Sequence, residues 1–356
     1  MSESTVLPAE CLRILRENAD RADDVATWPK TSWDALKDAG VSGWCVPTEQ
    51  GGAGLEPVAL LEGYESLASA CLTTCFILSQ RDAACRRLRD SVSGSRAAEL
   101  LPRLARGEIF ATVGISQLTT SRQHGGPALI ARQGDSGYLL TGVAPWVTGA
   151  EHADYLILGA SLEDGRQLLG LVSRKAVGLS VGPPLELMAL RGSLTAWVTC
   201  EEVLLEQAWV LAGPVEKVLQ TGKGGAGGLE TSCLALGAAR AAVDMLAQEA
   251  KLRPNLADMC ERLAKAYARL RTELHGLAGT PCSGEAATDL RAKANTLVLR
   301  ATQSALATAK GAGFVHPHPA QRLARQAMFF LVWSCPQPAA TATLEALSGG
   351  SGSFCS

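Results

Sequence analysis

The sequence contains no run of about 18 consecutive apolar residues, the length that a helix needs to cross a bilayer. At its beginning it also lacks the basic segment followed by an apolar one that marks a secretory signal peptide. These two absences predict a protein that is neither exported nor embedded in a membrane, and we expect it in the cytoplasm.

Long runs of lysine and arginine are absent as well. The 33 Lys and Arg residues are balanced by 35 Asp and Glu residues, which gives a formal net charge of −2, and the charges are spread along the chain. Because binding to a phosphate backbone depends on concentrated positive charge, nucleic acid is not expected as a partner.

The 11 cysteines include no C-x-x-C pair. Cys71 and Cys75 are spaced one helical turn apart, as metal ligands can be, but no histidine or second cysteine pair lies near them in the sequence. We therefore predict no metal site and interpret most cysteines as small apolar residues in a reducing compartment.

Hydrophobic periodicity divides the 356 residues into three units. Apolar residues at spacings of three and four predict helices over residues 1–108, interrupted by a loop at Val46 to Pro57. Short apolar runs predict strands over residues 109–212, and RQGDSGYLL reads as a hairpin. Long stretches rich in Ala and Leu predict a helical bundle over residues 213–356. The order helices, strands, helices favours an α+β fold.

The segment TGKGGAGG, from Thr221 to Gly228, joins the second unit to the third. A phosphate-binding loop is one interpretation, but the Walker spacing of lysine and glycine is absent. The composition favours a flexible connector.

Five blocks occur in an order that resembles the acyl-CoA dehydrogenase superfamily of flavoenzymes. The resemblance implies a helical N-terminal domain, a middle β-barrel, a C-terminal four-helix bundle and bound FAD. The blocks are AGVSGWCVPTEQGGAGLEP, ATVGISQLTT, GVAPWVTGAEHADYLILGA, LRGSLTAWVTCEEVLL and GAGFVHPHPAQRLARQA.

The resemblance implies four flavin contacts in the β-rich unit. In the family, the tryptophan of a W-[IV]-T block lies against the isoalloxazine ring and the threonine bonds near N5; Trp146 and Thr148 match them. A [FV]-T-E-P run holds the pyrimidine edge, and Ile115 and Ser116 match its start, although the Glu and Pro are lost. A core tryptophan beside a turn threonine is the alternative.

Two further contacts are implied in the bundle. Arg253 matches the family arginine that binds the flavin pyrophosphate of a neighbouring subunit, and Gly311 matches a glycine that passes close to the adenosine part. Contacts across subunits imply a homodimer or homotetramer. Arg253 fits equally well as a charge at a helix C-terminus, and Gly311 as a helix stop.

The usual catalytic base of the family is missing. Its glutamate lies in a Y-E-G-T turn, and Ser334 stands at that position, where a hydroxyl cannot replace a carboxylate. Some members supply the glutamate from the helix that opens the bundle, and Glu230 is the acidic residue nearest to that position. The alternative for Glu230 is a first-turn glutamate favoured by the helix dipole.

The resemblance implies an FAD-dependent oxidoreductase of fatty acid metabolism that dehydrogenates an acyl thioester to a 2,3-enoyl thioester. The implied electron acceptor is an electron-transfer flavoprotein or oxygen. Two alternatives stay open: a flavin-dependent monooxygenase of the same fold, which needs no base at Ser334, and a non-catalytic scaffold.

Overall fold

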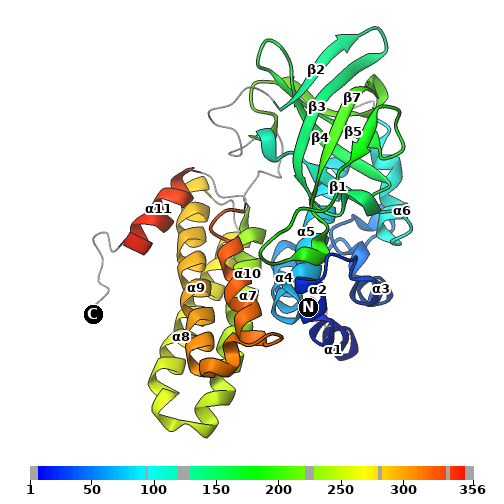
Figure 1. Ribbon diagram of the computed structural model, residues 1–356. Coiled ribbons are helices and arrows are strands. Elements are labelled where there is room, and N and C mark those ends of the chain that lie inside the picture. The colour runs from blue at the N-terminus through cyan, green and yellow to red at the C-terminus, as the bar shows by residue number, and fades with distance from the viewer. Residues whose placement is uncertain are drawn as a thin grey trace.

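The computed structural model describes residues 7–92, 95–118, 128–220, 228–279, 283–333 and 337–348. It begins with a layer of helices that lies below a sheet and beside a helical bundle (Figure 1). The helices of this first layer are α1 (Ala9–Glu17), α2 (Ala19–Asp24), α3 (Lys30–Asp38), α4 (Pro57–Ala70), α5 (Leu72–Arg89) and α6 (Leu101–Ala105).

Helix α5 is the element that joins the three parts of the molecule. Ile77 belongs to the core of the sheet, Phe76 to the core shared with the bundle, and Leu88 to a third core that includes residues of α6 and β1. A helix covered on several sides carries buried residues around its whole circumference instead of along one stripe. The helix therefore places side chains at each interface of the protein.

The middle of the chain forms one mixed eight-stranded sheet with the order β6-β7-β3-β2-β4-β5-β8, in which β1 pairs with β4. The predicted hairpin is confirmed, because β2 and β3 pair antiparallel down to Gly134 and Gly137 at the turn. The sheet curves around its own apolar core (Figure 1). The strands are β1 (Ala111–Gly114), β2 (Leu129–Gly134), β3 (Gly137–Val147), β4 (Tyr155–Ser161), β5 (Gln167–Ser173), β6 (Leu179–Val181), β7 (Ala196–Glu206) and β8 (Val210–Val215).

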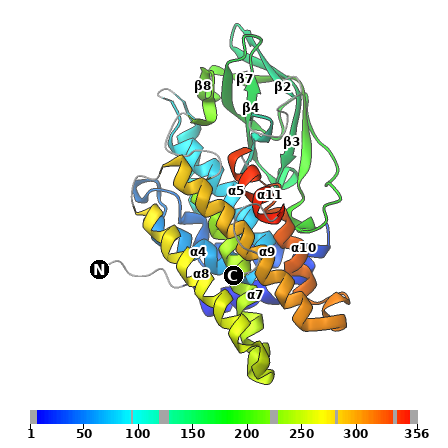
Figure 2. The same cartoon turned by 90° about the vertical axis from the view of Figure 1, so that its left-hand side faces the viewer.

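The last part of the chain is a bundle in which α8, α9 and α10 lie side by side (Figure 2). The three long helical stretches predicted from Ala and Leu content are confirmed as α7, α8 and α9. The predicted connector Thr221 to Gly228 lies outside the described residues except for Gly228, the N-cap of α7. The helices are α7 (Leu229–Leu252), α8 (Ala257–Ala278), α9 (Gly284–Phe314), α10 (Pro319–Phe329) and α11 (Gln337–Ser348).

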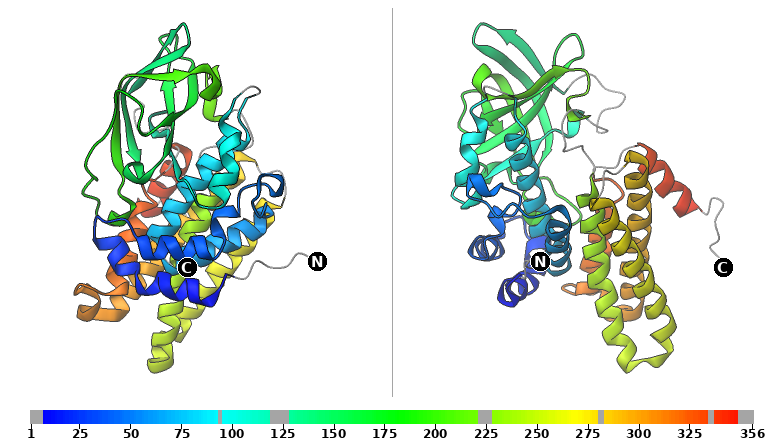
Figure 3. Two further views of the ribbon diagram at one scale, coloured as in Figure 1. Left: turned by 90° about the vertical axis from the view of Figure 1, so that its right-hand side faces the viewer. Right: turned by 180° about the vertical axis from the view of Figure 1, so that it is seen from behind.

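The bundle packs against the N-terminal helices through α7 and α4, with the sheet above the N-terminal helices (Figure 3). Gly237 of α7 makes this contact close: a Cβ atom there would lie 2.6 Å from Ala68 Cβ and 2.7 Å from the carbonyl oxygen of Glu65. The predicted α+β architecture of helices, sheet and helices is confirmed. Within the described residues, no helix combines the length and apolar character that a membrane span requires.

Candidate functional site

Trp146 lies at the surface in a strained backbone conformation. Its φ is +61°, a value that bulky residues rarely adopt, and it is 52% exposed. The residue sits where the register of β3 against β7 shifts between Ala144 and Val147. A bulge re-aims a side chain. Strain at an exposed aromatic ring is a reason to infer a binding position here.

The turn after β1 is held against the residue that precedes Trp146. Ser116 begins the 3-10 helix η4 (Ser116–Leu118), and its hydroxyl donates to the carbonyl oxygen of Pro145 over 2.9 Å. Gln117 anchors the same turn, because its Nε2 donates to the carbonyl oxygen of Gly159 over 2.6 Å. Ile115 is half-buried beside them. The structure therefore brings Ser116 close to Trp146, near the end of β3.

Thr148 is buried two residues beyond Trp146. Its Oγ1 lies 3.3 Å from Thr195 Oγ1, which in turn lies 2.9 Å from Ser193 Oγ. Each hydroxyl can donate only one hydrogen. Three hydroxyl groups that share two contacts with one another have a third O–H, which can donate to a further acceptor.

Glu230 lies in the first turn of α7, as the sequence predicts, and pairs with an arginine of α5. The distance between Glu230 Oε1 and Arg86 Nη2 is 3.4 Å. Burial alone would lower the pKa of Arg86, but the negative groups around it, Glu230 first among them, together outweigh burial and raise that pKa above its ordinary value. Nη1 of Arg86 is buried and has no hydrogen-bond partner among the described residues. No local sequence pattern links these two residues.

Arg253 and Gly311 lie at the opposite end of the bundle. Helix α7 has 24 residues and is about 36 Å long; it begins on the side of the sheet and ends at the far tip of the bundle (Figure 1). Arg253 caps that far end, donating to the carbonyl oxygen of Thr308 over 3.0 Å and pairing with Glu249. Gly311 is exposed near the end of α9. Within one chain, the structure does not bring this pair together with Trp146.

Comparison with known proteins finds relatives of the chain. The family model described as the acyl-CoA dehydrogenase N-terminal domain matches residues 11–108, so this part of the chain is similar to acyl-CoA dehydrogenases in sequence. A probable acyl-CoA dehydrogenase of Bacillus subtilis, YngJ, is 26% identical over 66% of this chain, and the match spans only 64% of that relative's length.

Solved acyl-CoA dehydrogenases share the fold over nearly the whole chain. Butyryl-CoA dehydrogenase from Megasphaera elsdenii superposes with a TM-score of 0.83 at 18% identity, covering 98% of this chain and 99% of that one. A glutaryl-CoA dehydrogenase from Mycobacterium smegmatis, solved in complex with FADH2, superposes with a TM-score of 0.78 at 18% identity, covering 99% and 96%.

The acyl-CoA dehydrogenase glutamate position, Ser334, lies outside the described residues. The residue before it, Trp333, is described and is firmly held. Its ring stacks on Phe329 at 5.1 Å and meets Phe76 edge-on at 5.0 Å. Nη2 of the buried Arg291 donates to the carbonyl oxygen of Trp333 over 2.9 Å. The residue before position 334 is therefore held by aromatic contacts with α5 and α10.

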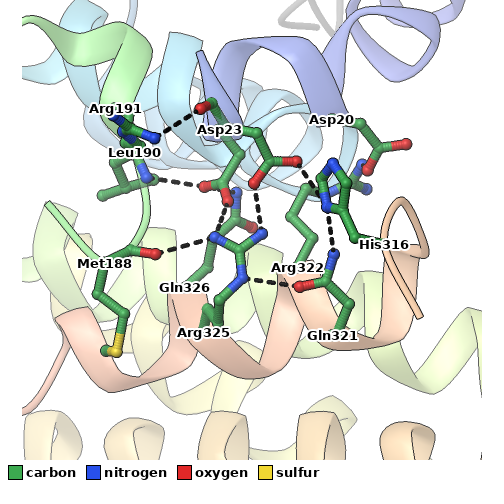
Figure 4. A network of polar contacts seen from close by, with 11 residues as sticks. Asp20, Asp23, Met188, Leu190, Arg191, His316, Gln321, Arg322, Arg325 and Gln326 are labelled. Atoms are coloured by element: carbon green, nitrogen blue, oxygen red, sulfur yellow. Dashed lines mark hydrogen bonds and ion pairs between the residues drawn. The ribbon is translucent and has the colours of Figure 1, made fainter. Parts of the chain in front are cut away.

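A polar network fixes α10 against α2 and the loop before β7, in the same acyl-CoA dehydrogenase fold (Figure 4). Arg325 pairs with the fully buried Asp23 at 2.8 Å and donates to the carbonyl oxygen of Met188 over 2.9 Å. Asp23 also accepts hydrogen bonds from Leu190 N and Gln326 Nε2, both over 2.8 Å. Burial raises the pKa of Asp23 despite these partners.

The two cysteines singled out by their spacing are part of the core. Cys71 lies 3.2 Å from the hydroxyl of Thr74, and Cys75 donates to the carbonyl oxygen of Tyr64 over 3.4 Å. Burial raises the pKa of both thiols. Sequence analysis missed a different pair, Cys45 and Cys85, which only the packing of α5 brings together.

Proposed function

We propose that the protein is an FAD-dependent oxidoreductase that acts on an acyl thioester. The observation that carries the proposal is the exposed, strained indole of Trp146 beside two hydroxyl-bearing segments. A flat aromatic face exposed near the end of β3 suits the ring of a flavin, which it would cover against water. The glutaryl-CoA dehydrogenase with this fold that was solved in complex with FADH2 supports the same cofactor.

The surroundings of Trp146 fit such a ring. Ser116 contacts the residue that precedes Trp146. The three hydroxyl groups of Ser193, Thr195 and Thr148 have an O–H to donate toward a ring nitrogen. Gln117 adds a buried acceptor, Oε1, which has no partner among the described residues and suits an N–H donor. When bound, the flavin would accept the hydride that leaves the β-carbon of the substrate.

In this proposal Glu230 takes the α-proton of the thioester. A carboxylate is required because the α-proton must be removed near neutral pH by a group within reach of the carbon. Arg86 holds one carboxylate oxygen of Glu230, which fixes its orientation. The unpartnered Nη1 of Arg86 suits the thioester carbonyl oxygen, on which negative charge grows as the proton leaves.

The proposal includes assembly into a homodimer or homotetramer. Arg253 and Gly311 lie a bundle length away from Glu230, so they would serve the flavin of a neighbouring subunit. The guanidinium of Arg253 has a planar fork that matches a diphosphate, and it is one-third exposed at the tip of the bundle. An electron-transfer flavoprotein or oxygen would complete the cycle by reoxidising the flavin.

Anaerobic titration of the FAD-loaded protein with a panel of acyl thioesters tests this function. We expect the absorbance of the oxidised flavin to bleach in proportion to the thioester added, with a 2,3-enoyl thioester as the product. Bound flavin that resists every thioester, but oxygenates a small substrate when reduced, would favour the monooxygenase. A protein that binds no flavin would be a scaffold.

A further inference from the structure

Cys45 and Cys85 form a buried pair of thiols at the junction of α5 and the segment after the 3-10 helix η1 (Val41–Gly43). Their Sγ atoms and a carboxylate oxygen of Asp82 all lie within 4.8 Å of one another. The two residues belong to the core cluster that also contains Leu88 and Leu104. Sulfur atoms this close can be joined by side-chain rotation and small shifts.

A buried guanidinium lies beside the pair. Arg81 is 1% exposed, and its Nη1 lies 3.9 Å from Cys45 Sγ. A hydrogen bond from Cys45 lowers the pKa of Cys85; the charge of Arg81 acts in the same direction, against burial. The same hydrogen bond, with burial, raises the pKa of Cys45. The two shifts favour ionisation of Cys85 over ionisation of Cys45, the asymmetry that reactive dithiols show.

The carboxylate of Asp82 is already engaged, which argues against a metal ion at this place. The hydroxyl of Tyr64 donates to Oδ2 over 2.6 Å, and Arg81 Nη1 donates to Oδ1 over 2.7 Å. A divalent cation would displace both donors and sit beside a guanidinium. Oxidation of the two sulfur atoms requires neither change.

A pocket borders one member of the pair. The pocket, of ≈ 250 Å³, is lined by Cys45 together with Glu49, Leu55 and Arg89. Arg89 follows Cys85 by one turn of α5, so the same pocket wall includes a residue one turn from Cys85. By contrast, among the described residues the hydrogen-bond partners of Cys71 and Cys75 are Thr74 and the carbonyl oxygen of Tyr64, and neither cysteine lines this pocket.

We propose that Cys45 and Cys85 are a modification site that closes into a disulfide when the protein meets a hydroperoxide. The Cys85 thiolate attacks one peroxide oxygen and the O–O bond breaks, which yields a sulfenic acid and, for hydrogen peroxide, hydroxide that takes up a proton. Cys45, losing its proton, then attacks the Cys85 sulfur; the S–S bond forms and water leaves. The two sulfur atoms lose two electrons in total, and one peroxide becomes two waters.

Peptide mapping after oxidation tests this site on the full-length protein. Purified protein is exposed to hydrogen peroxide, quenched, unfolded in N-ethylmaleimide and digested with trypsin and a glutamate-specific protease. We expect the peptide 38–49, which contains Cys45, to be found joined to the peptide 82–86, which contains Cys85, with the loss of two hydrogens. Dithiothreitol should release both.

Cys71 and Cys75 are the internal control, because both lie in the separate peptide 66–81. We expect them to react with peroxide at least about tenfold more slowly than the Cys45–Cys85 pair, since a pKa change of one unit alters the thiolate fraction about tenfold. Equal rates at both pairs would overturn the proposal, as would free Cys45 and Cys85 in fully peroxide-treated protein.

Two variants and one metal make the test specific. Cys85→Ser should abolish the joined peptide, whereas Cys71→Ser should leave it unchanged. If Cys85→Ser does not fold, the peptide map of the oxidised wild-type protein still shows whether Cys45 and Cys85 are joined. Protection of both thiols by added Zn²⁺, with no joined peptide after peroxide alone, would instead assign the site to a metal and overturn the proposal.

Discussion

Arg86 of α5 and Glu230 of α7 form an ion pair of 3.4 Å between Nη2 and Oε1, across the interface that joins the N-terminal helices to the bundle. Both side chains are partly covered, with 19% of Arg86 and 31% of Glu230 exposed. An acid held in this way has a defined orientation, which a first-turn glutamate facing only solvent would lack. The pair therefore gives the proposed base a fixed place in the fold.

Replacing Glu230 by glutamine should leave flavin binding intact and slow thioester-dependent bleaching by about 100- to 10,000-fold, the usual contribution of a positioned general base. Stopped-flow absorbance under anaerobic conditions measures the rate. Asp244→Asn is the control, because Asp244 lies on the same helix and is 69% exposed. Unchanged bleaching in Glu230→Gln would remove Glu230 from the mechanism.

Replacing Arg325 by alanine should destabilise the protein by about 3–5 kcal/mol, because it leaves the fully buried Asp23 without its cation. Arg322, three residues earlier on the same helix, pairs with Asp20, which is 40% exposed. Arg322→Ala should cost about 0–1 kcal/mol of pairing energy. Urea unfolding of both variants measures the difference. Equal losses of stability in the two variants would show that the burial of Asp23 does not determine what the loss of Arg325 costs.

The raised pKa of Asp23 predicts a dependence of stability on pH. Its carboxyl takes up a proton in the folded protein at a pH at which the unfolded chain is still ionised, so folding gains stability as the pH falls through the folded pKa toward the ordinary value of 3.8. Asp23→Asn cannot titrate. The free energy of unfolding of the wild type should therefore rise relative to that of Asp23→Asn between neutral pH and the ordinary value. A difference between the two free energies of unfolding that stays constant over this pH range would contradict a raised pKa of Asp23.

Alanine at Gly237 should destabilise the protein by about 1–3 kcal/mol, since the new methyl group meets Ala68 and a backbone oxygen of α4. Gly276 of α8 has no atom within 4 Å of an added Cβ. Gly276→Ala should therefore stabilise the protein by about 0.5–1 kcal/mol through helix propensity alone. Thermal unfolding of the two variants compares a crowded glycine with an open one. A loss of stability in both would refute the packing explanation.

Local sequence patterns predicted the elements well for a physical reason. The three long stretches of the bundle and the hairpin at Gly134 to Gly137 are specified by residues close together in the chain, through helix propensity and turn chemistry. The order of the three units follows from where the hydrophobic period changes.

Contacts between distant residues could not be predicted in this way. Arg86 and Glu230, Cys45 and Cys85, and Asp23 and Arg325 each meet only because separate elements pack together. The left-handed backbone of Trp146 also has no local signal, since glycine or asparagine usually marks such a position. Only the resemblance of the surrounding block to the family pointed to Trp146 itself.

Arg253 and Gly311 lie a bundle length from Glu230 within one chain, because α7 has 24 residues. The family resemblance implied from the outset that they serve a neighbouring subunit, and that role stays a prediction. Sedimentation of the FAD-loaded protein would measure whether it forms an oligomer.

The central claim is that Trp146 covers a bound flavin, and titration of the protein with FAD under indole excitation tests it most directly. We expect a bound flavin spectrum and quenched indole emission in the wild type. Trp146→Leu should weaken FAD binding by about two- to tenfold and lose much of the quenching, because a stacked aromatic pair contributes about 0.5–1.5 kcal/mol beyond the area it buries. A protein that stays colourless in excess FAD, or a Trp146→Leu variant that binds and quenches as the wild type does, would contradict the account.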